Sequence, residues 1–313
     1  MAASMAKTAR KKTAAKKPAK TVRPTAAYYF TERNSVNVVQ ERSGAGADQR
    51  AKFLVDALVK HLHAFVKETE PTMEEWMYGI RFLTRTGHLC TDWRQEFILL
   101  SDVLGISMLV ESINNRKNCG ETEATVLGPF HVPDAPRYGN GADIRLDGKG
   151  EPLWIHGRVL AAEGRPVAGA TLDIWQANAD GFYDVQQKGL QPDMNLRGVF
   201  TSDAEGRYDL RSCYPRYYPI PFDGTVGDML KALDRNPNRP AHIHFIVSAP
   251  GYKPVTTHIF TPGCPWLKDD AVFGVKESLI ADFKKTDDPR RAAELGLANP
   301  FWAVQWDFIL SKT

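Results

Sequence analysis

The sequence predicts an α+β protein, with an N-terminal helical region followed by an antiparallel β-sandwich. Two observations predict this class. Between about residues 46 and 113, apolar side chains recur at spacings of three and four, which is the period of an amphipathic helix. Beyond about residue 125, short runs rich in β-branched and aromatic residues alternate with Gly, Pro and Asp, a pattern typical of strands joined by turns. Helices that precede the strands, rather than alternating with them, favour the α+β class.

The helical region is predicted to contain three helices. The first carries an apolar stripe that begins at Leu54 and recurs at intervals of three and four. The second begins at a capping box formed by Thr72 and Glu75. The third covers residues 93 to 112 and is apolar around much of its circumference, which favours burial among other helices or at a subunit interface.

The β-region is predicted to contain several short strands at the spacing typical of a sandwich or barrel. They cover residues 152 to 160, 170 to 177, 197 to 201, 206 to 213, 241 to 248 and 255 to 261. A short helix at residues 225 to 235 interrupts them, and the segment WAVQWDFIL near the C-terminus is predicted to be a closing strand.

Composition excludes several classes of protein. The chain has 313 residues and 43% hydrophobic content, with no run of about 18 apolar residues that could span a membrane. We therefore expect a cytoplasmic protein. The four cysteines include no C-x-x-C pair, which argues against a structural zinc or iron–sulfur site. They are Cys90, Cys119, Cys213 and Cys264.

The positive charge of the chain is concentrated at its N-terminus. Residues 1 to 24 contain eight Lys or Arg and no acidic residue, which leaves 32 basic against 37 acidic residues in the rest. We expect residues 1–27 to form a disordered basic tail. Such a tail can aid solubility, bind polyanions without specificity or direct the chain to an organelle. Because the rest of the chain is mildly acidic, we expect no specific nucleic acid partner.

Two histidines, His242 and His244, stand one residue apart in the predicted strand RPAHIHF. Side chains two positions apart on a strand point to the same face, so both imidazoles could bind one metal ion. The alternative is that each is a structural histidine with its own hydrogen bonds. Tyr183 and a cluster of three further tyrosines in CYPRYYPIP are candidate ligands beside them. Phenolate oxygens together with imidazoles suit Fe(III), although ligand type alone does not exclude other metals.

Five segments together carry a resemblance to a known family. They are DGFYDVQ, RGVFTSDAEGRYDLRS, YYPIPFDGTVG, RPAHIHFIVSAPGY and TTHIF. In this order and spacing they resemble the intradiol ring-cleavage dioxygenases, and THIF and DDAVFGVKESLI are most similar to the hydroxyquinol 1,2-dioxygenases of that family. The resemblance covers residues 28 to 312. It implies a helical dimerisation region at 28–122 and a β-sandwich catalytic domain at 123–313. It also implies a homodimer formed through the N-terminal helices, at whose interface a lipid can bind.

The resemblance also implies a ligand set and two catalytic roles. One non-haem Fe(III) per subunit would be held by Tyr183, Tyr218, His242 and His244, with Tyr218 and His244 axial. Tyr218, which follows Pro215 by three residues in the family's P-x-x-Y motif, would serve as ligand and general base. Arg239 would stabilise negative charge that develops on the substrate ring.

A substrate pocket follows from the same resemblance. Its implied lining residues are Leu89, Asp92, Val126, Leu127, Gly128, Pro129, Ile220, Pro221, Phe222, His258 and Phe273. Asp92 can either contact a third substrate hydroxyl or cap the helix that follows. His258 stands where the catechol enzymes have Gln, and it can either tune the iron ligands or replace Gln as a hydrogen-bond donor.

The implied reaction is the opening of hydroxyquinol by O2 to 3-hydroxymuconate and maleylacetate. Cleavage of catechol to cis,cis-muconate is the alternative, since small aromatic diols and triols share the same reacting hydroxyl pair. A β-sandwich binding module without catalytic activity, in which the histidines and tyrosines are structural, is the alternative from another class.

Overall fold

The computed structural model describes residues 29–43, 48–91, 94–116 and 120–313. The predicted basic tail and Asp92 lie outside these residues. The chain divides into two compact units, Met1–Gly79 and Ile80–Thr313. The predicted domain boundary at residue 122 stays a prediction.

The first unit contains α1 (Ser35–Arg42), α2 (Gln49–Thr69) and the beginning of α3 (Met73–His88). Asp48 caps α2 by accepting a hydrogen bond from the backbone N–H of Ala51. At the start of α3, the Thr72 backbone N–H donates to Glu75 over 2.8 Å, and the Glu75 backbone N–H donates to the Thr72 hydroxyl over 3.2 Å. This is the predicted capping box.

The predicted third helix is wrong, because two helices occupy that segment. They are α4 (Glu96–Val103) and α5 (Ile106–Asn114). Gly105 lies between them with φ of 73°, in the left-handed region that ends a right-handed helix and that favours glycine. The second unit also contains α6 (Thr225–Ala232), at the predicted short helix, and α7 (Pro289–Leu295).

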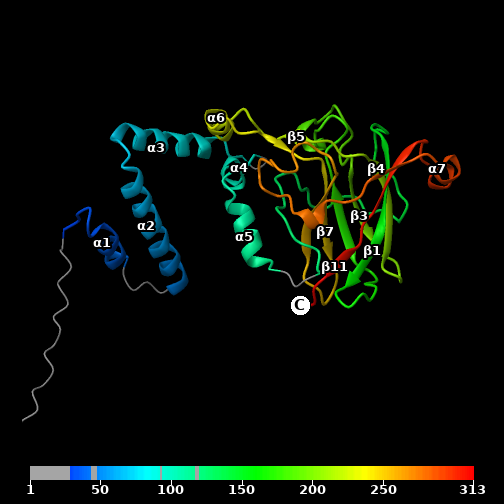
Figure 1. Cartoon of the computed structure of the whole chain (residues 1–313), viewed down its shortest axis with the longest axis horizontal. Helices are drawn as coiled ribbons and strands as arrows, with labels where there is room; N and C mark the ends of the chain where they lie inside the picture. The colour runs from blue at the N-terminus through cyan, green and yellow to red at the C-terminus, as the bar shows by residue number, and fades with distance from the viewer. Residues whose placement is uncertain (1–28, 44–47, 92–93, 117–119) are drawn as a thin grey trace, which may run out of the picture. The chain divides into compact units, whose positions relative to one another are not determined.

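Strands form at all six predicted positions and at the predicted closing segment (Figure 1). The six are β1 (Pro152–Ala161), β2 (Thr171–Trp175), β3 (Arg197–Thr201), β4 (Arg207–Cys213), β7 (His242–Ser248) and β8 (Val255–Phe260). The closing segment forms β10 (Phe301–Gln305) and β11 (Phe308–Leu310). Three short strands were not predicted, β5 (Tyr218–Pro219), β6 (Asn238–Arg239) and β9 (Lys284–Thr286).

Two sheets pack face to face, as predicted. One has the order β3-β2-β7-β8, and the other has the order β11-β1-β10-β9 with β4 paired to β1. Side chains from both sheets share one buried core, among them Ile155 and Leu210 from one sheet and Leu172 and Phe245 from the other. The closing strands β10 and β11 pair with β1 in parallel, whereas the other pairs are antiparallel. The alternating pattern shows which face of a strand is buried but carries no information about its direction.

Strand register brings distant segments together at one end of the β3-β2-β7-β8 sheet. His244 on β7 lies opposite Trp175 on β2 and opposite His258 on β8. The short ladder of β5 and β6 pairs Tyr218 with Arg239.

In the part of the chain that the structure describes, none of the helices has the length and apolar character needed to cross a membrane.

Candidate metal centre

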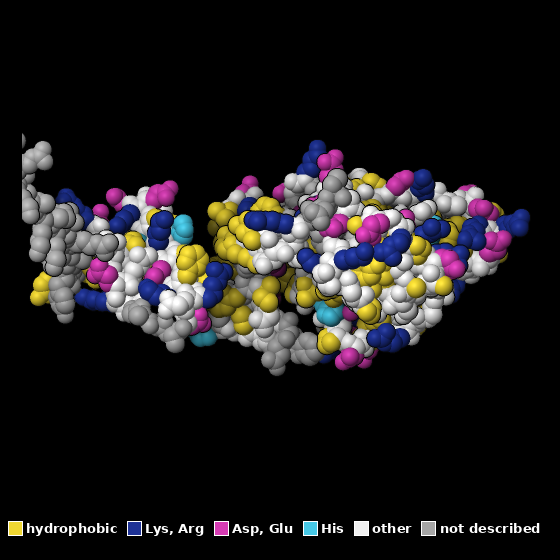
Figure 2. All heavy atoms as spheres, turned by 90° about the horizontal axis from the view of Figure 1, so that it is seen from below, with side chains coloured by type: hydrophobic (Ala, Val, Ile, Leu, Met, Phe, Trp, Pro, Cys, Tyr) yellow, Lys and Arg dark blue, Asp and Glu magenta, His cyan; other side chains and the backbone are white. Residues whose placement is uncertain are grey.

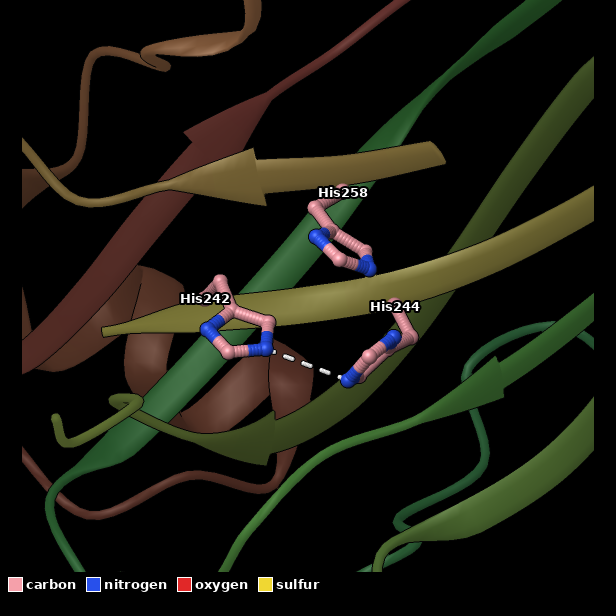
Figure 3. Close-up of side chains that lie close together, drawn as sticks. All are labelled: His242, His244 and His258. Atoms are coloured by element: carbon pink, nitrogen blue, oxygen red, sulfur yellow. Dashed lines mark hydrogen bonds between the residues drawn. The ribbon is translucent and has the colours of Figure 1, made fainter. Parts of the chain in front are cut away.

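His242 and His244 project from the same face of β7 and are buried (Figure 3). Their Nε2 atoms lie 3.1 Å apart. His242 Nδ1 lies 2.6 Å from the Pro240 carbonyl oxygen and donates to it, which leaves the Nε2 lone pair directed at its neighbour. Burial lowers the pKa of both imidazoles well below the ordinary value, so both are neutral and able to bind a metal.

Two buried tyrosines meet the histidines. The Tyr183 hydroxyl, just before a short 3-10 helix, lies 2.9 Å from the Tyr218 hydroxyl and 2.9 Å from His244 Nε2. The Tyr218 hydroxyl lies 3.5 Å from His242 Nε2. Burial raises the pKa of both phenols, so a nearby cation is needed for them to ionise. The structure thus brings together the four side chains that the sequence singled out.

The spacing of these four donor atoms fits a single ion. Ligand atoms about 2.0–2.1 Å from a common metal, at tetrahedral or octahedral angles, lie about 2.8–3.4 Å from each other. The neighbouring donor atoms here are separated by 2.9 to 3.5 Å. The two imidazoles and the two phenols are all neutral as they stand. A highly charged cation bound between them would let the phenols ionise and would balance their negative charge.

His258, on β8, is a third histidine at the cluster (Figure 3). Its ring lies 4.1 Å from the His244 ring and nearly perpendicular to it, and the ligand nitrogens of the three histidines lie within 4.8 Å of one another. Burial lowers the pKa of His258 well below its ordinary value, in spite of a backbone hydrogen bond with Val126 that raises it, so this imidazole is also neutral. The tyrosine hydroxyls approach the pair His242 and His244 more closely, so the two-tyrosine, two-histidine set is the tighter fit.

Arg239 places a buried positive charge beside the cluster. Its Nη1 lies 3.2 Å from His242 Nε2, and its Nε donates to Asp270 over 3.3 Å. Burial alone would lower the pKa of Arg239, but Asp270 and the phenols of Tyr218 and Tyr183 raise it on balance. The guanidinium is therefore charged.

Sequence reasoning missed two side chains at the cluster. Trp175 stacks on His244 with ring centroids 4.6 Å apart and an angle of 12° between the planes. Asp270 pairs with Arg239. The alternation of β2 indicates only that Trp175 packs inside, and Asp270 lies 31 positions from Arg239 in a segment with no periodic pattern.

Seven of the predicted pocket residues line two cavities of the second unit, whereas Leu89, His258 and Phe273 line neither. One, of about 790 Å³, is lined by Val126, Leu127, Gly128 and Pro129 together with Asp102. The other, of about 510 Å³, is lined by Pro129, Ile220, Pro221 and Phe222. Gln95 lines both cavities.

Gly128 connects the first cavity to the cluster. A Cβ atom at Gly128 would lie 3.2 Å from His244 Cε1, so the backbone approaches the imidazole as closely as packing allows. Phe273 is half-exposed and packs against the guanidinium of Arg235.

Comparison with known proteins identifies the family. The model described as "Catechol dioxygenase N terminus" matches residues 48–122, and the model described as "Dioxygenase" matches residues 127–312. The chain belongs to the intradiol ring-cleavage dioxygenases. The family predicted from the sequence is thus confirmed, and the alternative of a non-catalytic binding module is wrong.

Three relatives of this dioxygenase show how far the likeness extends. It is 56% identical to a hydroxyquinol 1,2-dioxygenase from Rhizobium sp. (strain MTP-10005), over 91% of this chain and 97% of the relative. It is 47% identical to a 6-chlorohydroxyquinol 1,2-dioxygenase from Cupriavidus pinatubonensis, over 91% and 99%. The crystal structure of a hydroxyquinol 1,2-dioxygenase from Pseudomonas putida DLL-E4 matches with a TM-score of 0.85 and 43% identity, over 90% of this chain and 99% of that one.

Proposed function

We propose that this dioxygenase opens the ring of hydroxyquinol between two adjacent hydroxyl-bearing carbons, with O2 as co-substrate and one non-haem Fe(III) per subunit. The product is 3-hydroxy-cis,cis-muconate, which tautomerises to maleylacetate. The observation that carries the proposal is the cluster of four donor atoms from Tyr183, Tyr218, His242 and His244, separated by 2.9 to 3.5 Å between neighbours. The hydroxyquinol enzymes among the relatives support the substrate.

Tyr183, Tyr218, His242 and His244 would hold the Fe(III), whose charge would keep the two phenols ionised and would make an aromatic diol reactive toward dioxygen. The residues themselves move and hold protons. A diol that bound through both oxygens would lose two protons; the Tyr218 phenolate oxygen would accept one of them as a general base, and the second would pass to the hydroxide that the diol displaces, which leaves as water. The hydrogen bond from His242 to Pro240 keeps the Nε2 lone pair available throughout.

Arg239 faces the place where negative charge develops. Its guanidinium is buried and lies 3.2 Å from a candidate metal ligand, so its charge acts where little water screens it. Burial and the pairing with Asp270 hold the guanidinium in place, so little reorganisation would be needed during ring opening. We assign to Arg239 the stabilisation of the anionic ring and to Tyr218 the proton transfer.

A third hydroxyl distinguishes hydroxyquinol from catechol, and it needs a polar partner in a pocket that is otherwise apolar. Asp92 and His258 are the proposed partners. His258 supports this role because its ring is buried at the cluster, with its centroid 4.1 Å from that of His244. A hydroxyl of the substrate would pair there with an imidazole nitrogen.

Comparison of the two diols tests the proposal. The full-length protein, reconstituted with iron, is assayed for O2 uptake with hydroxyquinol and with catechol, and the products are analysed by mass spectrometry. We expect kcat/KM to favour hydroxyquinol by about tenfold or more, since loss of a hydroxyl leaves a buried polar group unpaired. The product should carry both atoms of O2. A preference for catechol would make the protein a catechol 1,2-dioxygenase instead.

We further propose a homodimer formed through the N-terminal helices, with lipid as a candidate ligand there. Within its own unit α2 buries none of its residues, and Leu54, Leu58, Leu62 and Phe65 along it are all more than half exposed. Apolar side chains also reach the surface in the helical part of the second unit (Figure 2). Exposed apolar surface on this scale is typical of a subunit interface.

A further inference from the structure

One edge of the Arg239 guanidinium pairs with Asp270. Nε donates to Asp270 Oδ1 over 3.3 Å, and Nη2 lies 3.5 Å from Oδ2. This side-on pairing uses one edge of the planar guanidinium and leaves Nη1 on the opposite edge. Nη1 is the atom that lies 3.2 Å from His242 Nε2. The position of the Asp270 carboxylate therefore sets the direction in which the Nη1 donors point, toward His242.

Backbone N–H groups also hold the carboxylate of Asp270. Its Oδ2 accepts a hydrogen bond from the Gly274 backbone N–H over 2.9 Å, and its Oδ1 accepts one from the Val272 N–H over 3.3 Å. The Gly274 carbonyl in turn accepts from the Thr125 hydroxyl over 2.8 Å. Two backbone donors thus hold the carboxylate in one orientation, independently of the guanidinium.

The backbone at Gly274 packs closely against the pair. A Cβ atom at Gly274 would lie 3.0 Å from Arg239 Nη2 and 3.1 Å from Asp270 Oδ2, so the backbone already closes over both groups. Arg239 and Asp270 have side chains only 4% and 2% exposed, so solvent does not compete for their charges. Among the described residues, the histidine group that could hold a metal consists of His242, His244 and His258 and does not include Asp270.

We propose that Asp270 is the positioning residue for Arg239, directing the Nη1 donors of the guanidinium into the cavity where the ring becomes anionic. This inference rests on the proposed ring cleavage and deepens it. The hydrogen bonds of Asp270 in the described residues go to Arg239 and to two backbone N–H groups, and none goes to a candidate ligand, so it acts through Arg239.

A double-mutant cycle on the iron-loaded full-length protein tests this role. The variants are Asp270→Asn, Arg239→Ala and the double substitution. We expect Asp270→Asn to retain iron and the visible tyrosinate absorption, and to lower kcat about tenfold with KM changed far less. In the Arg239→Ala background the same substitution should lower kcat less than about twofold, because the group through which Asp270 acts is gone. An equal loss in both backgrounds, or loss of the absorption band, would overturn the proposal.

A further variant separates position from charge, and measurements of folding accompany it. Asp270→Glu keeps the charge and should restore part of the kcat lost in Asp270→Asn, with the same spectrum. An Asp270→Glu variant with the full kcat of the parent would show that charge alone matters and would contradict a positioning role. Circular dichroism and denaturant melts of both Asp270 variants show whether either has lost its fold.

The proposed function and this inference fail separately. If the iron-loaded parent protein does not cleave hydroxyquinol or catechol, the proposed function is wrong. If the parent cleaves its substrate and Asp270→Asn does so at the parent rate, only the positioning role of Asp270 is wrong.

Discussion

Single residues of the cluster divide into those that hold the metal and one that acts on the substrate. His242→Ala and His244→Ala should each abolish the colour of the iron-loaded protein, because each removes a donor atom from the four. Arg239→Ala should leave the protein coloured but lower kcat about 100-fold, the loss typical of a buried charge-stabilising group. Visible absorption and elemental iron, measured on the same samples as kcat, distinguish the two classes. A colourless Arg239→Ala variant would contradict the division.

Adjacent tyrosines provide a matched pair for the proton acceptor. Tyr218 is buried with its hydroxyl 2.9 Å from that of Tyr183, whereas Tyr217 is 40% exposed and packs against Trp266. Tyr218→Phe should lower kcat about 100-fold or more, since a ligand and a general base are lost together. Tyr217→Phe should leave both kcat and the absorption band unchanged. The reverse result would place the ligand at Tyr217.

The sequence predicted the members of the cluster better than its surroundings. Tyr183, Tyr218, His242 and His244 stand in local motifs, and the spacing of the two histidines alone places them on one strand face. Trp175 and Asp270 reach the site only through strand pairing and a loop contact between distant segments. Nothing in their local sequence indicates a neighbour so far along the chain.

Among the elements, the break between α4 and α5 depends on one backbone conformation. Gly105 has φ of 73°, where a Cβ is strained, and Gly79 lies inside α3 with open space around it. Gly105→Ala should lower the free energy of unfolding by about 1–2 kcal/mol. Gly79→Ala should raise it by about 0.5–1 kcal/mol, because alanine loses less backbone entropy in a helix. Denaturant melts measure both, and opposite signs are expected.

Secondary-structure prediction failed where the spacing of apolar residues carries no information. In residues 93–112 apolar side chains continue on both sides of Gly105, so their spacing gives no sign that the helix ends there. The closing strand was placed correctly, but its parallel pairing with β1 depends on the path of the chain between β9 and β10. The strands β5 and β6 are each two residues long, too short for a period to be recognised.

At the scale of the whole molecule, the exposed apolar face of α2 predicts the oligomeric state. Leu58→Glu introduces a charge in that face and should shift the protein from dimer to monomer by light scattering. Lys60→Glu introduces the same side chain at an exposed polar position of α2 and should leave the dimer intact. A parent protein of monomer mass would contradict the dimer proposal.

The central claim is that two tyrosines and two histidines hold Fe(III) and that a diol binds directly to that site. The most direct measurement is the visible spectrum of the iron-loaded protein before and after anaerobic addition of hydroxyquinol, with catechol as the comparison. We expect a red to burgundy protein whose tyrosinate absorption changes on addition of hydroxyquinol in the absence of O2, with one iron per subunit. A protein that is colourless at full iron content, or a spectrum that hydroxyquinol leaves unchanged, would contradict the account.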